Sequence, residues 1–101
     1  MGKSGPKATE LFRSKRHYAD GATLEMTLWI VPAPVRGSRH RIKYSLYYGV
    51  PGQRLIGYDN EPGKGDHRHY GAVEQAYTFT SVEQLVSDFL DDVRRVRGGR
   101  L

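Results

Sequence analysis

The chain of 101 residues contains no cysteine, and this absence excludes several classes of site together. Without thiols there is no disulfide scaffold, thiolate zinc site, iron–sulfur cluster or cysteine nucleophile. Long apolar runs are missing as well: the most apolar run, residues 28–31, stops at Pro32 and falls far short of the roughly 20 residues that a membrane helix requires. The first six residues carry a lysine but no apolar stretch follows them, so the sequence predicts no secretory signal. We therefore expect a cytoplasmic protein without membrane association, whose fold depends on its hydrophobic core.

Internal repeats and long linkers are also absent, and the length fits one domain. We predict a disordered leader at residues 1–8, a single domain at residues 9–97 and a flexible tail at residues 98–101.

The formal net charge is +5, and it is unevenly distributed. Residues 1–48 carry nine Lys or Arg and three Asp or Glu, whereas the rest of the chain carries seven and eight. A basic half indicates nucleic acid as a partner, with an acidic protein second, although a merely solvated basic surface explains the charge equally well.

Alternation of apolar and polar side chains predicts strands in the first part of the chain. Leu24, Met26 and Leu28 alternate with polar residues after the Asp20-Gly21 dipeptide, which is a strong signal for a hairpin turn. Four strands are expected, at residues 9–18, 22–30, 39–48 and 54–60. Turn-forming composition predicts loops at residues 32–38 and 61–66. Residues 67–70 fit either the end of that loop or the start of pairing, and residues 76–79 fit a short edge strand.

The last element is predicted most clearly, because apolar residues recur at helical spacing between Val82 and Val96. Thr80 and Ser81 each offer a capping interaction at its start, and Gly98-Gly99 ends it. A helix of about 16 residues would be about 24 Å long, and its apolar stripe needs a partner. The predicted fold class is therefore α+β, an antiparallel sheet of four to five strands with one C-terminal helix packed on one face.

Residues 58–70 hold the densest group of chemically active side chains: two His, one Lys, one Arg, two Asp and two Tyr. A hydrophobic core has no use for this mixture, because buried charges are costly unless they are paired. Asp66 could cap a turn and either histidine could satisfy backbone groups, but this explains single residues better than it explains the cluster. The segment is therefore the first choice for a functional site.

The string Lys64-Gly65-Asp66-His67-Arg68-His69 resembles the TumE-type toxins of bacterial toxin–antitoxin pairs. The similarity spans about residues 10–96 and includes Tyr58-Asp59-Asn60 and residues 18–21, 38–44 and 77–85. The resemblance implies a toxin that is neutralised by a cognate antitoxin with a helix-turn-helix domain. It implies no settled target and no catalytic residues, so the chemistry has to come from the residues themselves.

Metal-independent RNA cleavage is the leading hypothesis for this segment. The reaction needs a base for the 2′-hydroxyl, an acid for the leaving oxygen and cations on the phosphate. We predict His67 and His69 as acid and base, with Asp66 orienting an imidazole and Lys64 and Arg68 on the phosphate. In an extended segment the two histidines share a face and Arg68 lies opposite, so a phosphate fits between the rings only if the loop spreads them. Further nucleic-acid contacts are predicted at Arg39, Arg41, Lys43, Tyr58 and Tyr70.

Other interpretations stay open. Asp66, His67 and His69, together with Asp59, could bind a metal, but the spacing is not a standard zinc pattern and we expect neither a metal nor a cofactor. The Gly63-Lys64-Gly65 turn could merely bind a phosphate through backbone amides. The expected function is a toxin that acts on nucleic acid, as an endoribonuclease that arrests translation; the alternative is a non-catalytic module that occupies nucleic acid or a protein. Open strand edges would also allow a homodimer.

Overall fold

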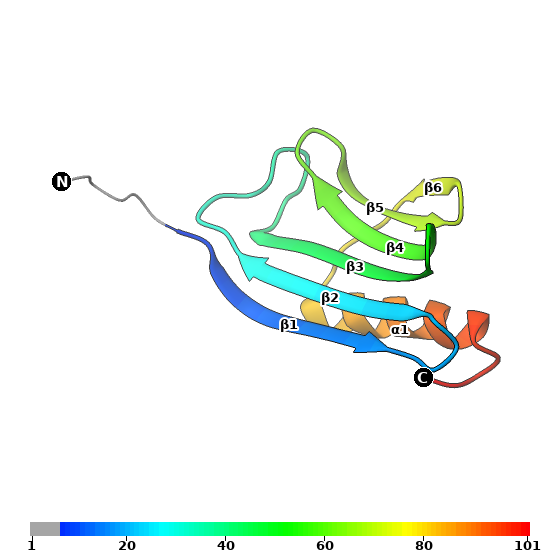
Figure 1. Ribbon diagram of the computed structural model, residues 1–101. Helices are drawn as coiled ribbons and strands as arrows, with labels where there is room; N and C mark the ends of the chain where they lie inside the picture. Colours follow the sequence, from blue (N-terminus) through cyan, green and yellow to red (C-terminus); the bar gives the residue numbers. More distant parts are fainter. Residues whose placement is uncertain (1–6) are drawn as a thin grey trace.

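A computed structural model describes residues 7–101, which form one antiparallel sheet with a helix on one side (Figure 1). The strands pair in chain order, so each is joined to the next by a turn or loop, without crossovers. They are β1 (Thr9–His17), β2 (Thr23–Ile30), β3 (Ile42–Val50), β4 (Gln53–Glu61), β5 (Gly65–Tyr70) and β6 (Val73–Ala76). The helix α1 (Val82–Val96) follows them, and the predicted α+β class is confirmed. Most of the predicted leader lies outside the described residues.

The sheet has six strands, whereas the sequence predicted four to five. The additional pairing comes from β5, which the sequence left as either loop or strand. Its buried positions are Gly65, His67 and His69, so no apolar alternation marks it as a strand. The edge strand β6 lies three residues before the predicted one, and all four of its residues are exposed. Residues 77–81 instead lead the chain from β6 to the helix.

The hydrophobic core lies between the sheet and α1. The Asp20-Gly21 turn forms as predicted, with Gly21 at a φ of +93° and the Ala22 amide donating to Oδ1 of Asp20 over 2.9 Å. From this turn onward, every second residue of the central strands points towards the helix. The largest fully buried side chains are Tyr44, Tyr58, Phe89, Leu28, Leu46, Leu85, Val93 and Asn60.

The ends of α1 follow the predicted signals. Ser81 is the N-cap and accepts a hydrogen bond from the Gln84 amide over 3.0 Å. At the other end Gly98 and Gly99 take positive φ angles, which glycine adopts without a steric penalty. The terminal residue Leu101 then packs back against the core. Within residues 7–101, α1 is too short and too polar to cross a membrane.

The sheet therefore has two different faces. One face carries Tyr44 and Tyr58 and packs against α1. We call the other face the open face, because no helix or strand of residues 7–101 packs on it. It carries the alternate residues of the same strands, including Lys43, Asp59 and His67.

Candidate functional site

Strand β5 divides the predicted catalytic residues between the two faces of the sheet. Arg68 pairs across the ladder with Tyr58 of β4 and lies on the helix side, whereas His67 pairs with Asp59 and lies on the open face. Asp66 shares the helix side with Arg68. The five predicted catalytic residues are therefore not brought together in one site. The histidines form one group, and the remaining predicted residues lie elsewhere.

On the helix side, a hydrogen-bond network surrounds the buried carboxylate of Asp92. Its Oδ2 accepts from the hydroxyls of Tyr58 over 2.5 Å and Tyr70 over 3.0 Å, and Nη1 of Arg68 donates to the Tyr58 hydroxyl over 3.3 Å. Burial, reinforced by the negative charge of Asp92, raises the pKa of Tyr58 well above its ordinary value. Tyr58 is fully buried, so no nucleic-acid base can stack on its ring. These residues join the sheet to the helix, and we do not keep Tyr58 as a nucleic-acid contact.

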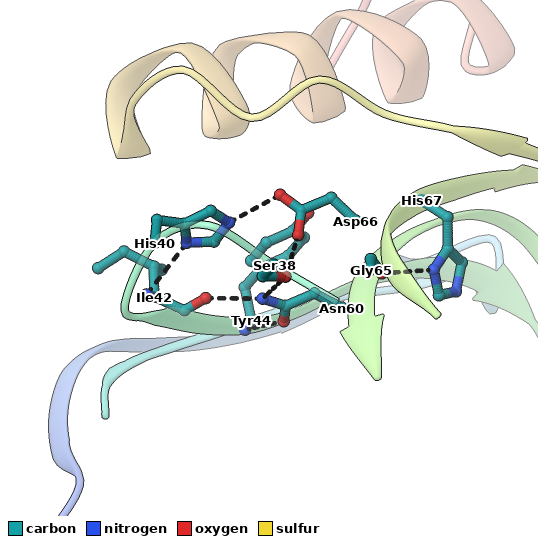
Figure 2. Close-up of polar contacts among 8 residues, drawn as sticks. All are labelled: Ser38, His40, Ile42, Tyr44, Asn60, Gly65, Asp66 and His67. Atoms are coloured by element: carbon teal, nitrogen blue, oxygen red, sulfur yellow. Dashed lines mark hydrogen bonds and ion pairs between the residues drawn. The ribbon is translucent and has the colours of Figure 1, made fainter. Parts of the chain in front are cut away.

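Asp66 contacts the imidazole of His40 and not that of His67 or His69, which lie on the other face of the sheet. Oδ2 of Asp66 lies 2.7 Å from Nε2 of His40, and Oδ1 accepts from the Ser38 hydroxyl. The Ile42 amide donates to Nδ1 of His40 over 3.1 Å, so both nitrogens of that ring are occupied. Figure 2 shows Asp66 directed at Ser38 and His40, whereas His67 points away from them.

Asn60 extends the hydrogen bonds of Asp66, Ser38 and His40 into a network, and its contacts show what this network does. Its Oδ1 accepts from the Tyr44 amide over 3.0 Å, and its Nδ2 donates to the Ile42 carbonyl over 2.8 Å and to the Ser38 hydroxyl over 3.3 Å (Figure 2). The His40 ring also stacks on Phe79 with centroids 3.7 Å apart. The network therefore fastens the loop of residues 31–41 to β4 and β5. Sequence reasoning had no signal for it, because Ser38 and Asp66 are 28 residues apart.

The predicted cations Arg39 and Lys64 lie near this network at the edge of the sheet. Both are exposed, and both line a shallow cavity of about 390 Å³. Arg41 is exposed just before β3, and Lys43 is exposed on the open face. These positions leave the four side chains accessible to a polyanion.

The open face gathers four side chains from three adjacent strands. Nε2 of His67 lies 2.5 Å from Oδ1 of Asp59 and 3.4 Å from Oε2 of Glu74, and Nε2 of His69 lies 3.7 Å from the same Asp59 oxygen. The two imidazole rings stand edge to face with centroids 4.9 Å apart. We call Asp59, His67, His69 and Glu74 the open-face cluster. Sequence reasoning found the histidines, whereas Glu74 enters only because β6 pairs with β5 and places it opposite His69.

A hydrogen bond orients the ring of His67, whereas Nε2 of His69 is left without a partner within residues 7–101. Nδ1 of His67 donates to the Gly65 carbonyl over 3.0 Å, because a carbonyl can only accept, and this leaves Nε2 directed at Asp59. Both histidines are buried, and Nε2 of His69 and Oδ1 of Asp59 have no hydrogen-bond partner within residues 7–101. Burial and the positive charge of Arg54 lower the pKa of His69. The donor set of Asp59, His67 and His69 could hold a metal ion, since the three ligand atoms lie within 4.8 Å of one another.

Arg54 is a functional candidate that no pattern in the sequence indicated. A Cβ on Gly57 would lie 2.8 Å from Cδ of Arg54, so the arginine stem occupies the space that the missing side chain leaves. Gly57 in turn faces His69 across the ladder. The arrangement places a guanidinium beside the imidazoles, where it can attract a phosphate group.

Comparisons with known proteins identify the family of the chain. No curated protein and no solved structure matches the chain. The family model described as Toxin TumE matches residues 6–97, which is nearly the whole chain and includes every strand and the helix. The chain therefore belongs to the TumE toxin family.

Proposed function

We propose that this toxin is an endoribonuclease that arrests translation, with its reaction centre at the open-face cluster. The observation that carries the proposal is the convergence of two imidazoles and a carboxylate on the open face, which no helix or strand of residues 7–101 covers. His67, His69 and Asp59 gain nothing in stability from such an arrangement unless their polar atoms are paired, and two of those atoms are not. Unpaired polar groups of this kind are typical of reaction centres.

The proposed reaction uses the side chains alone. Nε2 of His69 has no hydrogen-bond partner within residues 7–101, and we assign it as the base that takes the proton from a 2′-hydroxyl. Because this atom is buried, neighbouring side chains have to move for the substrate to reach it. Nδ1 of His67 donates to the Gly65 carbonyl, which leaves Nε2 beside Asp59 as the atom that gives a proton to the leaving 5′-oxygen in the proposed reaction. The attack of the 2′-oxygen on the adjacent phosphorus then yields a cyclic phosphate and a 5′-hydroxyl end. Arg54 supplies positive charge for the phosphate.

Cations distributed over the open face support a polyanionic substrate. Lys43 pairs with Trp29 across β2 and β3, and Arg13 and Lys15 lie on the outermost strand of the same face. Arg13 also packs against the Trp29 ring, with Cζ 5.9 Å from its centroid. Phosphate contacts of this kind position a nucleic acid without reading its sequence. We propose Arg39, Arg41 and Lys43 as contacts of this type.

Inducible expression in a bacterium tests the proposal. The wild type should arrest growth and produce new RNA 5′-hydroxyl ends, and His67→Ala and His69→Ala should abolish both. A synthetic RNA with a single deoxynucleotide at the cleavage site should resist the purified toxin, since the 2′-hydroxyl is the attacking group. Cleavage should continue in EDTA. Arrest with intact RNA would instead support the non-catalytic alternative, in which the open face only occupies its target.

Membership of a toxin family implies a partner antitoxin. We propose that this antitoxin carries a helix-turn-helix domain and presents acidic side chains, because the first half of the toxin is strongly basic. Co-expression of the neighbouring gene should restore growth, and the two proteins should copurify. A lower affinity between toxin and antitoxin at high salt would support acidic side chains on the antitoxin.

A further inference from the structure

The open-face cluster combines side chains that can bind a metal ion. His67 and His69 are two residues apart on one strand, so both rings point to the same face. Asp59 lies opposite His67 on β4, and Glu74 lies opposite His69 on β6. Three adjacent strands thus deliver nitrogen and oxygen ligands to one point of a rigid sheet.

The hydrogen bonding at this point is incomplete. Oδ1 of Asp59 is 2.5 Å from Nε2 of His67, yet it has no hydrogen-bond partner of acceptable geometry within residues 7–101. Nε2 of His69 is also buried without a partner, in a residue that is only 8% exposed. Buried polar atoms in native proteins are nearly always satisfied. An ion between these atoms would satisfy all of them together.

The geometry points to a binding site for one divalent transition-metal ion of the Zn²⁺ type, held by Oδ1 of Asp59 and by Nε2 of His67 and His69. Glu74, whose side chain is exposed, lies at the solvent side of the site and would supply the fourth ligand, an oxygen. Ligand atoms around a tetrahedral Zn²⁺ ion are about 3.3 Å apart, given metal–ligand bonds of about 2 Å. The contacts of Asp59 with His67 (2.5 Å) and His69 (3.7 Å) and of His67 with Glu74 (3.4 Å) lie on either side of that value. The ligand atoms of Asp59, His67 and His69 lie within 4.8 Å of one another, so the side chains would have to rotate to admit the ion.

The surrounding contacts favour the same ligand class. Nδ1 of His67 donates to the Gly65 carbonyl, which is the outer hydrogen bond that metal-binding histidines commonly make (Figure 2). Two imidazoles favour Zn²⁺, Co²⁺ or Ni²⁺ over Mg²⁺ and Ca²⁺, which prefer oxygen ligands alone. The carboxylates of Asp59 and Glu74 balance the charge of a divalent ion. Arg54 beside His69 opposes a cation, so it lowers the affinity of the site without abolishing it.

If the proposed function holds, a metal ion at this site competes with catalysis. The metal and the transferred protons require the same Nε2 atoms of His67 and His69. A loaded site therefore lacks both acid and base, and Zn²⁺ should inhibit an RNA cleavage that EDTA leaves intact. Metal occupancy would then regulate the toxin at its reaction centre.

Direct binding tests the site without reference to RNA. The full chain, with any affinity tag removed, is titrated with Zn²⁺ by calorimetry and with Co²⁺ by visible absorption. We expect one equivalent per chain, tetrahedral Co²⁺ bands and a higher melting temperature with Zn²⁺, and no such effects with Mg²⁺. Asp59→Asn and His69→Ala should each weaken Zn²⁺ binding by about tenfold or more. Arg54→Gln should tighten it.

The matched control is His17→Ala. It removes an exposed histidine from β1, on the same face of the sheet but far from the open-face cluster. Its Zn²⁺ affinity should equal that of the wild type. Circular dichroism confirms that each variant folds. If His69→Ala does not fold, Asp59→Asn still tests the site, because it keeps the size of the side chain. Absence of stoichiometric binding would overturn the inference, as would equal binding by the folded Asp59→Asn variant. Neither result bears on RNA cleavage, which has its own assay.

Discussion

Asp59 and His67 face each other across β4 and β5, and Oδ1 of Asp59 lies 2.5 Å from Nε2 of His67. The two residues are eight positions apart in the chain, and the hairpin between their strands sets their distance. The position of this pair defines the open-face cluster, because His69 and Glu74 approach the same point from the neighbouring positions. The first prediction concerns this pair.

Asp59→Asn should reduce RNA cleavage by about a hundredfold while the protein stays folded, because the amide keeps the size of the carboxylate but does not stabilise a protonated His67. Single-turnover cleavage of a synthetic RNA measures the effect. Asp91→Asn is the control, since Asp91 is an exposed carboxylate that pairs with Arg94 on the surface of the helix. Equal cleavage by the wild type and Asp59→Asn would remove Asp59 from the reaction centre.

Asp92→Ala should lower the free energy of unfolding by about 2–3 kcal/mol, because the buried hydroxyl of Tyr58 and the partly buried hydroxyl of Tyr70 lose their acceptor. Urea denaturation measures the change. Asp91→Ala, one position earlier on the exposed side of the helix, should cost less than about 0.5 kcal/mol. Similar losses in the two variants would contradict the role of Asp92 in joining sheet and helix.

Asn60→Ala should release the loop of residues 31–41. The substitution leaves the Tyr44 amide and the Ile42 carbonyl without their side-chain partner, at a cost of about 2 kcal/mol. Limited trypsin digestion reports on the loop, which contains Arg36 and Arg39 as cleavage sites. We expect faster cleavage there than in the wild type, and an unchanged rate in the exposed control Gln53→Ala. A protected loop in Asn60→Ala would show that other contacts hold it.

Gly57→Ala should impair RNA binding more than stability. Its new Cβ would lie 2.8 Å from Cδ of Arg54, and that flexible side chain can move away without disturbing the backbone. The guanidinium would then leave its position beside His69. Binding of RNA, measured by fluorescence anisotropy at several salt concentrations, should weaken and show a smaller salt dependence. Arg54→Gln should reproduce the effect, and unchanged binding in both variants would exclude Arg54 as a phosphate contact.

Alkaline pH should destabilise the fold through its buried tyrosines. Burial and the carboxylate of Asp92 raise the pKa of Tyr58 above the ordinary value of 10.0, and burial with Asp88 does the same for Tyr77. A raised folded-state pKa gives a contribution that is complete below pH 10 and is lost as the pH rises above it. The melting temperature of the wild type should therefore fall above pH 10. The melting temperature of Tyr58→Phe should fall less steeply over the same pH range. Identical slopes would show that Tyr58 ionises in the folded state as it does in the unfolded state.

The sequence determined the elements whose signals are local. The Asp20-Gly21 turn, the alternating strand of Leu24 and Leu28, and the capped helix that begins after Ser81 all depend on residues within a few positions of one another. The motif containing His67 and His69 was also sufficient to recognise the family, because residue identities alone carry that resemblance.

Only the tertiary structure decided which of those residues act together. Pairing of β5 with β4 sends Asp66 and Arg68 to the helix side and both histidines to the open face, because neighbouring strand residues point in opposite directions. Register across three strands brings in Asp59 and Glu74, and a missing Cβ at Gly57 makes room for Arg54. Such groupings depend on contacts between strands, which no local pattern encodes. The sequence therefore determined the kinds of side chain available, and the sheet register decided their partners.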